Sequence, residues 1–332
     1  MQKLINDPER FVDEMLDGLL LAHPDLLKAS PADRRVLVRA DLPTPGRVGI
    51  VTGGGSGHLP VFLGYVGTGL CTAAAVGNVF SSPSSAQFLE ATRAANGGAG
   101  VLYLYGNYGG DVLNVDLAAD AAEDEGIPTR SVVVSDDVAA APPERADDRR
   151  GVAGLFFAYK CAGAAAERGD SLDEVAKIAG TAAEATRSMG VGLSAAILPT
   201  VGRPTFELQS GEMEIGIGIH GEPGVHRGPL EPADAVTERL VGAIAEDLQL
   251  GTGDRVAVLV NGLGATPREE LYIVYRHTRH ILDGLGVTVE HPYIGEYATS
   301  LEMAGASVSI MRLDADLAEL LDAPARSPFF QR

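Results

Sequence analysis

Residues 101–134, VLYLYGNYGGDVLNVDLAADAAEDEGIPTRSVVV, decide the fold class of this chain. The apolar run at 101–105 is typical of a buried strand, and the segment 111–125 is typical of a helix that Gly126 ends. A second strand is predicted at 131–134. A strand, a helix and a strand in succession predict α/β architecture, in which helices cover a sheet.

The same alternation extends in both directions from this unit. Toward the N-terminus the pattern predicts helices and strands at 8–23, 36–39, 47–51 and 84–95. Toward the C-terminus it predicts helices at 152–168, 171–188, 233–248, 267–282 and 317–321, and strands at 192–198, 214–219, 255–260, 287–290 and 308–312. Because the alternation restarts after Gly190, we predict two α/β domains, 1–190 and 191–332, each a mixed sheet covered by helices.

Composition limits the classes of partner. The 332 residues include 26 Lys and Arg against 45 Asp and Glu, a net charge of −19, which disfavours nucleic acid and anionic membranes as partners. Arg145, Arg149 and Arg150 form a small basic cluster that we expect to be a solvated loop. The two cysteines predict no disulfide framework, and no signal sequence or long apolar run is visible, so a cytoplasmic protein is expected.

Two segments place a histidine where an apolar, strand-like run enters a glycine turn. One is residues 216–224, GIGIHGEPG, with His220, and the other is residues 51–60, VTGGGSGHLP, with His58. Glycine at such turns lets backbone and ligand approach closely, because it has no Cβ. One histidine in an apolar segment is usually structural, but the repeated arrangement favours a single site that contains both imidazoles.

Residues 53–57, GGGSG, resemble neither a Walker A loop nor a complete dinucleotide fingerprint, so a small polar ligand is favoured. Asp111 is either a helix N-cap or a carboxylate that takes a proton from a substrate hydroxyl, and the residues alone leave both open. The same holds for residues 259–267, which shape a site wall or a subunit contact, or form a simple strand-to-helix turn. Metal binding by His220 is disfavoured, because Glu222 and His226 do not stand at a spacing known for metal ligands. We expect Glu222 at a turn and His226 at the surface.

Taken together, these segments resemble the K-subunit family of dihydroxyacetone kinases. The resemblance extends over nearly the whole chain, from residue 3 to residue 324, and its motifs occur in the order of the family. They are GGGSGH at 53–58, GYVG at 64–67, NYGGD at 107–111, GIGIHGEPG at 216–224 and NGLGATP at 261–267.

The resemblance implies roles for individual residues. His220 would attack a ketose carbonyl and form a covalent hemiaminal, which selects carbonyl sugars over glycerol. His58 would hydrogen-bond the substrate and assist proton transfer, and Asp111 would be the base toward the terminal hydroxyl that receives the phosphoryl group. Backbone groups of Gly55, Ser56 and Gly57 would bind sugar hydroxyls, and no metal is expected on this chain.

The resemblance also implies partners. Subunits of the K type hold the sugar and no cofactor, so ATP or ADP with Mg is expected on a separate helical, nucleotide-binding L-type subunit. The chain ends at Arg332, where single-chain relatives continue into such a domain. The ultimate donor is either ATP itself or a phosphotransferase relay that recharges a bound nucleotide. A homodimer is expected.

Two departures from the family pattern bear on the substrate. Gly106 stands where a lysine is expected, and Leu59-Pro60 stands where Glu-Pro is more usual. These changes predict a substrate larger than dihydroxyacetone, such as the four-carbon ketose erythrulose. The alternative function is a non-catalytic ketose sensor, which would not need a base at Asp111. A nucleotide-dependent dehydrogenase is less favoured, because no acidic ribose-binding residue follows a fingerprint.

Overall fold

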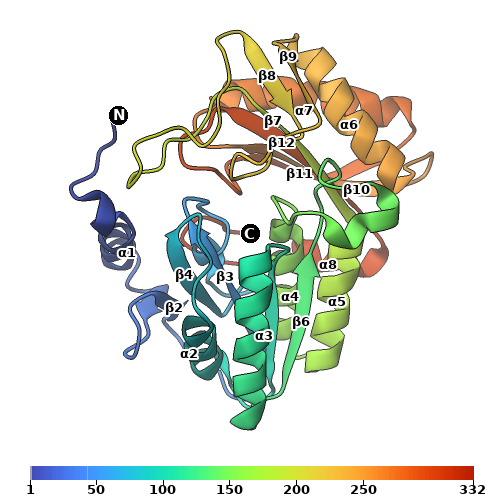
Figure 1. Ribbon diagram of the computed structural model, residues 1–332. Coiled ribbons are helices and arrows are strands. Elements are labelled where there is room, and N and C mark those ends of the chain that lie inside the picture. The colour runs from blue at the N-terminus through green and yellow to red at the C-terminus, as the bar shows by residue number, and fades with distance from the viewer. Residues whose placement is uncertain (1, 43) are drawn as a thin grey trace.

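The computed structural model describes residues 2–42 and 44–332 and contains two six-stranded sheets with flanking helices (Figure 1). The predicted α/β fold class is confirmed. The first sheet has the strand order β1-β2-β4-β3-β5-β6. Its strands are β1 (Leu27–Ala29), β2 (Val36–Arg39), β3 (Gly49–Ser56), β4 (Ala73–Val79), β5 (Val101–Gly106) and β6 (Thr129–Val134).

The unit at residues 101–134 forms as its pattern predicts. Strands β5 and β6 pair in parallel from Val101–Thr129 to Gly106–Val134, and α3 (Gly109–Asp124) connects them. β3 pairs in parallel with both β4 and β5, whereas β1 and β2 form an antiparallel edge. The carboxyl ends of β3, β4 and β5 therefore meet at one edge of the sheet, where open α/β sheets bind their ligands.

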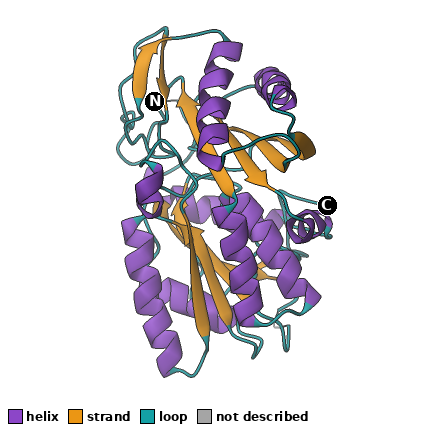
Figure 2. Ribbon diagram, turned by 90° about the vertical axis from the view of Figure 1, so that its right-hand side faces the viewer, coloured by secondary structure: helices purple, strands orange, loops and turns teal. Residues whose placement is uncertain are grey.

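Helices cover both faces of the first sheet. Tyr103 of β5 joins the apolar core beneath α2 (Ser85–Ala95) and α3, whereas its neighbours Leu102 and Leu104 join the core that contains α4 (Leu155–Arg168) and α5 (Leu172–Glu184). Figure 2 shows the strands of this unit between the two groups of helices. Alternating side chains along one strand therefore supply two separate cores.

The second sheet has the order β11-β10-β12-β7-β8-β9, with α6 (Ala233–Leu248) and α7 (Arg268–Gly284) packed on it. Its strands are β7 (Thr186–Gly192), β8 (Glu212–Ile215), β9 (His226–Pro229), β10 (Arg255–Gly262), β11 (Thr288–Gly295) and β12 (Gly305–Arg312). β7 therefore spans the predicted boundary at Gly190. The chain begins with η1 (Pro8–Arg10) and α1 (Phe11–Ala22), and after α8 (Ala315–Asp322) its end returns to the first unit, where Arg326 N donates to Thr68 O at 2.9 Å.

Several local expectations were wrong. The predicted strand at 214–219 ends at Ile215, and the predicted helix at 171–188 ends at Glu184, because β7 begins at Thr186. Residues 192–198 are not a strand: β7 ends at Gly192, Leu193 N and Ser194 N both donate to Ala304 O, and Pro199 lies in the irregular segment 193–211. Residues 53–55 are not a loop either, because β3 continues through them to Ser56. The alternation of residue types did not reveal where these elements end, because the ends depend on which strand of the sheet lies alongside.

The arginine cluster is also not a solvated loop. Arg149 is 1% exposed and makes a two-bond ion pair with Asp247 of α6, with Nη–Oδ distances of 3.0 and 2.5 Å. Arg150 is nearly buried and pairs with Asp137, which leaves Arg145 as the exposed member. These ion pairs attach the segment before α4 to Asp247 of α6 and to Asp137. No helix in the described part of the chain is long and apolar enough to cross a membrane.

Candidate functional site

The three residues predicted to be catalytic converge at the carboxyl edge of the first sheet. Asp111 and His220 line one pocket of about 380 Å³, a size typical of small-molecule sites. The ring of His58 lies beside it, with its centroid 4.8 Å from that of His220 and 4.7 Å from the stacked ring of Phe80. Residues 162 positions apart in the chain are thereby brought into one site, as the two-imidazole hypothesis requires.

The glycine run gives the site its close packing. A Cβ at Gly53 would lie 2.6 Å from the Phe88 ring, one at Gly54 would collide with Phe62, and one at Gly55 would lie 2.6 Å from Ser81 N. The run lets the end of β3 pass between these neighbours, which explains why it contains more glycine than one turn needs.

Of the backbone positions predicted to bind sugar, Gly55 lines the pocket. The Ser56 hydroxyl donates to Gly77 O at 2.8 Å, and the Gly57 carbonyl accepts from Leu301 N at 2.7 Å, so both of these groups already have protein partners. Sugar binding by the backbone of Gly55, Ser56 and Gly57 stays a prediction.

His58 is held as a neutral hydrogen-bond acceptor. Its Nδ1 lies 2.8 Å from Thr299 O, and because a carbonyl can only accept, Nδ1 carries the proton and Nε2 the lone pair. Burial, together with the nearby charge of His220, lowers the pKa of His58 to about 3. Nε2 is buried and finds no partner among the described residues. A hydroxyl of a bound ligand would supply the missing donor.

Asn261 supports His58 from the end of β10. Its Oδ1 accepts from Tyr297 N at 2.8 Å and Ala298 N at 2.9 Å, while its Nδ2 donates to Ala298 O at 2.7 Å. This buried side chain fixes the segment that presents Thr299 O to His58. The sequence left the segment 259–267 open between a site wall, a subunit contact and a simple turn, and Asn261 in it supports the site indirectly.

Asp111 lies in the first turn of α3, but it is not the N-cap, since that position belongs to Tyr108. Its side chain is buried, with Oδ1 unpaired within the described structure. Burial raises the pKa of Asp111 to about 6, against the opposing influence of Ser82 and His220. A buried carboxylate with a pKa near neutrality and a free oxygen suits a general base.

His220 is fixed by Glu222, a contact that sequence reasoning missed. Glu222 Oε1 lies 2.8 Å from His220 Nδ1, and Oε2 accepts from His220 N at 2.5 Å. Burial would raise the pKa of Glu222, but its hydrogen bond with His220 and the charges of His220 and Arg150 outweigh burial and lower the pKa to about 2. The expectation that Glu222 is only a turn residue was wrong. An acidic residue two positions after a candidate nucleophile was the available signal.

The ionised Glu222 accepts the proton of Nδ1, so in the neutral form of the His220 ring the lone pair lies on Nε2. Tyr108, a second residue that the sequence did not single out, packs its ring edge-on against His220 with centroids 4.9 Å apart. Phe80 does the same at 5.1 Å. The imidazole is thus held at its Nδ1 side and at its ring faces and edges, which leaves Nε2 as the atom available for chemistry.

The two substitutions that predicted a larger substrate do not themselves line the pocket. A Cβ at Gly106 would meet Gly151 O at 3.2 Å and the side chains of Leu155 and Tyr108 at 3.4 Å. Leu59 packs with the apolar cluster of α1 and β4. Gly109 lines the pocket, and a Cβ at this exposed position would have no described atom within 4 Å.

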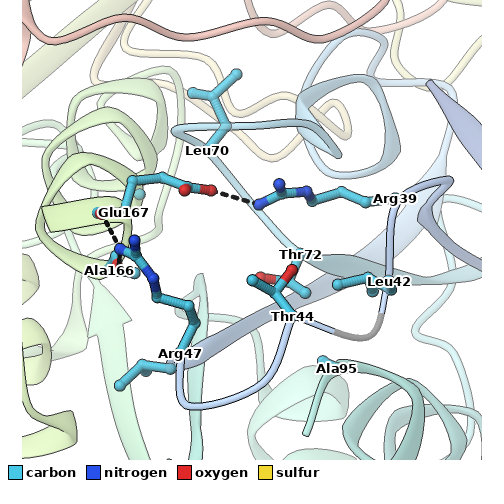
Figure 3. Close-up of a pocket in the computed structure, with 11 residues that line it drawn as sticks. Arg39, Leu42, Thr44, Arg47, Leu70, Thr72, Ala95, Ala166 and Glu167 are labelled. Atoms are coloured by element: carbon cyan, nitrogen blue, oxygen red, sulfur yellow. Dashed lines mark hydrogen bonds and ion pairs between the residues drawn. The ribbon is translucent and has the colours of Figure 1, made fainter. Parts of the chain in front are cut away.

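A second hollow beside β2 and α4 carries no comparable chemistry (Figure 3). Its volume of about 20 Å³ is close to that of one water molecule. Arg39 is paired with Asp41 at 2.8 Å and Glu167 at 2.5 Å, and Arg47 donates to Ala166 O at 3.1 Å. Across residues 2–42 and 44–332, no group of three or more His, Cys, Asp or Glu side chains is arranged to hold a metal ion.

Comparison with known proteins gives a consistent result. The model of the Dak1 domain matches residues 17–329. The chain is 45% identical, over its full length and 99% of the relative, to the dihydroxyacetone-binding subunit DhaK of PTS-dependent dihydroxyacetone kinase 2 from Listeria innocua. It is 43% identical to the D-erythrulose kinase of Mycolicibacterium smegmatis, of which it spans 57%.

Two solved structures are similar along nearly the whole chain. The dihydroxyacetone kinase operon co-activator DhaQ superposes with a TM-score of 0.88 and 31% identity, over 95% of this chain and 97% of that one. The dihydroxyacetone kinase of C. freundii in complex with AMP-PNP and Mg²⁺ superposes with a TM-score of 0.87 and 33% identity, over 98% of this chain and 60% of that one.

Proposed function

Because this chain belongs to the Dak1 family and is of the DhaK type, we propose that it is the ketose-binding subunit of a dihydroxyacetone-type kinase. It holds a short ketose as a hemiaminal on His220, while a separate helical subunit donates the phosphoryl group to the terminal hydroxyl. The observation that carries this proposal is the His220–Glu222 contact of 2.8 Å, because it leaves the Nε2 lone pair free in the pocket that Asp111 also lines.

The covalent step follows from that geometry. The Nε2 lone pair of His220 forms a bond to the carbonyl carbon, and the π pair of the carbonyl moves to oxygen. The oxygen takes a proton from water, which leaves hydroxide in the solvent. The ring gains a positive charge that the Glu222 carboxylate balances through Nδ1–H. Glycerol has no carbonyl and cannot form the adduct, so covalent binding supplies the selectivity.

Phosphoryl transfer requires removal of a proton from the terminal hydroxyl. Asp111 takes that proton as the ketose oxygen bonds to phosphorus and the bond from phosphorus to the donor's leaving group breaks. His58 accepts a hydrogen bond from a ketose hydroxyl through Nε2. The nucleotide with Mg belongs to the partner subunit. Support comes from the C. freundii kinase, which binds AMP-PNP and Mg²⁺ and extends well beyond the region that matches this chain. We expect the chain to be a homodimer, which light scattering would test.

The substrate follows from the room in the pocket. Because a Cβ at Gly109 would have no described atom within 4 Å, the site accepts a four-carbon ketose such as erythrulose in addition to dihydroxyacetone. The likeness to a D-erythrulose kinase supports this size class.

The first experiment is native mass spectrometry of the chain with dihydroxyacetone, D-erythrulose, L-erythrulose and glycerol, beside His220→Ala. We expect a ketose adduct that the variant lacks and that glycerol never forms. An adduct that survives His220→Ala, or no adduct with any ketose, would overturn the covalent role of His220. The most populated adduct nominates the substrate for kinase assays.

A ketose-sensing regulator is the second candidate, favoured by the likeness to the operon co-activator DhaQ. Both functions would retain the adduct, so adduct formation does not separate them. Asp111 does, because a sensor needs no base at that position. If Asp111→Asn leaves adduct formation intact and abolishes phosphorylation with a partner subunit, the chain is catalytic; if the wild-type chain supports no phosphorylation with any nucleotide subunit encoded beside it, the sensor is preferred.

A further inference from the structure

The turn that carries His220 in the second unit is attached to a charged pair of the first unit. Arg150, which precedes α4, donates through Nε to Asp137 Oδ2 at 2.9 Å and lies 2.7 Å from the same atom through Nη2. Asp137 follows β6, and its side chain is 3% exposed. Its Oδ1 accepts from Ala139 N at 3.0 Å, so this carboxylate is fixed on both oxygens.

Arg150 contacts both ends of the catalytic turn. Its Nη2 donates to Gly216 O at 3.0 Å, where the turn begins, and its Nη1 lies 4.0 Å from Glu222 Oε2, close to where the turn ends. Glu222 in turn bonds the backbone N and the ring Nδ1 of His220. A planar guanidinium can make these contacts in several directions at once, which a lysine ammonium on a flexible stem cannot do.

The sequence makes room for this contact at Gly218. A Cβ at this position would lie 2.5 Å from Arg150 Nη1 and would collide with Glu222 Oε2. The glycine is therefore required by the approach of the guanidinium to the carboxylate. In addition, the backbone beside the pair is shared between the units, since Val138 N donates to Ser188 O of β7 at 3.0 Å.

We propose that Arg150, anchored by Asp137, is a positioning residue that orients Glu222 and thereby fixes the ring tautomer and direction of the covalent histidine. This inference rests on the proposed function of His220. The arginine comes from one unit and the histidine from the other. The contact between the two units would therefore have a role in catalysis. An arginine that merely joined the two units would support stability and leave the imidazole unaffected.

The test compares Arg150→Met, Arg150→Lys and Glu222→Gln with Arg276→Met, which removes an exposed ion pair with Asp234 on the surface of α7. The first readout is the nitrogen-15 spectrum of the histidine rings. The chain has 7 histidines, and His220→Ala assigns the signal of interest. The second readout is the fraction of ketose adduct by native mass spectrometry, and the third is the thermal midpoint.

We expect the wild-type ring to carry its proton on Nδ1, and Arg150→Met and Glu222→Gln to give mixed tautomers. Adduct formation should fall by about 10- to 100-fold in both, because misorientation of a reacting group commonly costs that much. Arg150→Lys should recover only part of the loss, and Arg276→Met should match the wild type. A wild-type tautomer and wild-type adduct level in Arg150→Met would overturn the proposal.

Two further controls keep the result interpretable. If Arg150→Met does not fold, Gly218→Ala disturbs the same contact from the other side and must give the same mixed tautomers. If the wild type forms no adduct, the proposed function fails, but the tautomer spectra still decide whether Arg150 orients His220. Fixed Nδ1–H in both Arg150→Met and Gly218→Ala would refute the positioning role in either case.

Discussion

Asp111 combines a proposed role as a base with a burial that costs stability. Its pKa is raised to about 6 by burial, whereas the ordinary value is 3.8. If it acts as the proposed base it must be ionised, so phosphorylation is expected to fall as the pH drops through about 6. Asp111→Asn should lower the phosphorylation rate by roughly 10²- to 10⁴-fold and leave adduct formation intact. Asp116→Asn, on the same helix, is the matched control.

The same residue yields a stability prediction with a definite sign. The folded state binds the proton of Asp111 more tightly than the unfolded chain does, so stability is lost as the pH rises from 3.8 through about 6. At neutral pH the ionised, buried carboxylate destabilises the fold by about 3 kcal/mol. Asp111→Asn should therefore raise the free energy of unfolding at pH 7 and have little effect at pH 3. Equal effects at both pH values in denaturant titrations would contradict this account.

Gly109 is expected to set the length of the ketose. Gly109 lines the pocket at the first position of α3, and a valine there would meet no described atom within 4 Å of its Cβ. Gly109→Val should lower the kcat/KM for erythrulose by about tenfold or more and change that for dihydroxyacetone much less, because a branched side chain displaces the extra hydroxymethyl group. Gly180→Val on α5, also free of neighbours, controls for glycine replacement in a helix. A parallel loss for both sugars would place the fourth carbon elsewhere.

At the scale of elements, support for the site comes from segments that carry no chemistry themselves. Asn261 bonds the backbone of Tyr297 and Ala298, and this segment presents the carbonyl that orients His58. Asn261→Ala would leave those buried backbone groups without partners, which typically costs about 1–3 kcal/mol each, less whatever water recovers.

We therefore expect Asn261→Ala to lower the free energy of unfolding by about 2–4 kcal/mol and to weaken ketose binding, since His58 loses its fixed orientation. Chemical denaturation and adduct titration would measure the two effects. Asn96→Ala removes an exposed cap bond to Gly98 N and should change neither by much. A stable variant with normal adduct formation would show that Tyr65, whose hydroxyl donates to Tyr297 O, suffices to hold the segment.

The sequence predicted elements well where local pattern determines them and poorly where neighbours do. The unit at 101–134 formed as predicted, because its strands and helix each follow their own periodicity. β3 was predicted to end before its glycines, but the strand continues through them. The reason that it lacks side chains there is visible only in the fold, where Phe62 and Phe88 occupy the space. Glu222 and Arg150 were misjudged for the same reason. Their partners are distant or depend on the path of a turn, and neither fact is visible in spacing alone.

At the scale of the whole molecule, α4 joins the two units into one body. All of its residues from Leu155 to Ala166 are buried, because the helix lies between the sheets. Phe156 packs on Tyr293 of β11 with ring centroids 5.0 Å apart, and the Lys160 ammonium donates to Leu320 O of α8 at 2.6 Å. A helix that is mostly apolar around its whole circumference is stable only when neighbours cover all of it.

This arrangement predicts that the two units unfold together. Separating them would expose the apolar surface of α4, at about 25 cal/mol for each Å². Calorimetry should therefore give one transition whose calorimetric and van't Hoff enthalpies agree. Ketose should raise its midpoint as a whole, because a ligand bound at the contact between the units stabilises both. Two resolved transitions, with only the second shifted by ketose, would show that the catalytic turn is independent of the first unit, and the link through Arg150 would then have no thermodynamic basis.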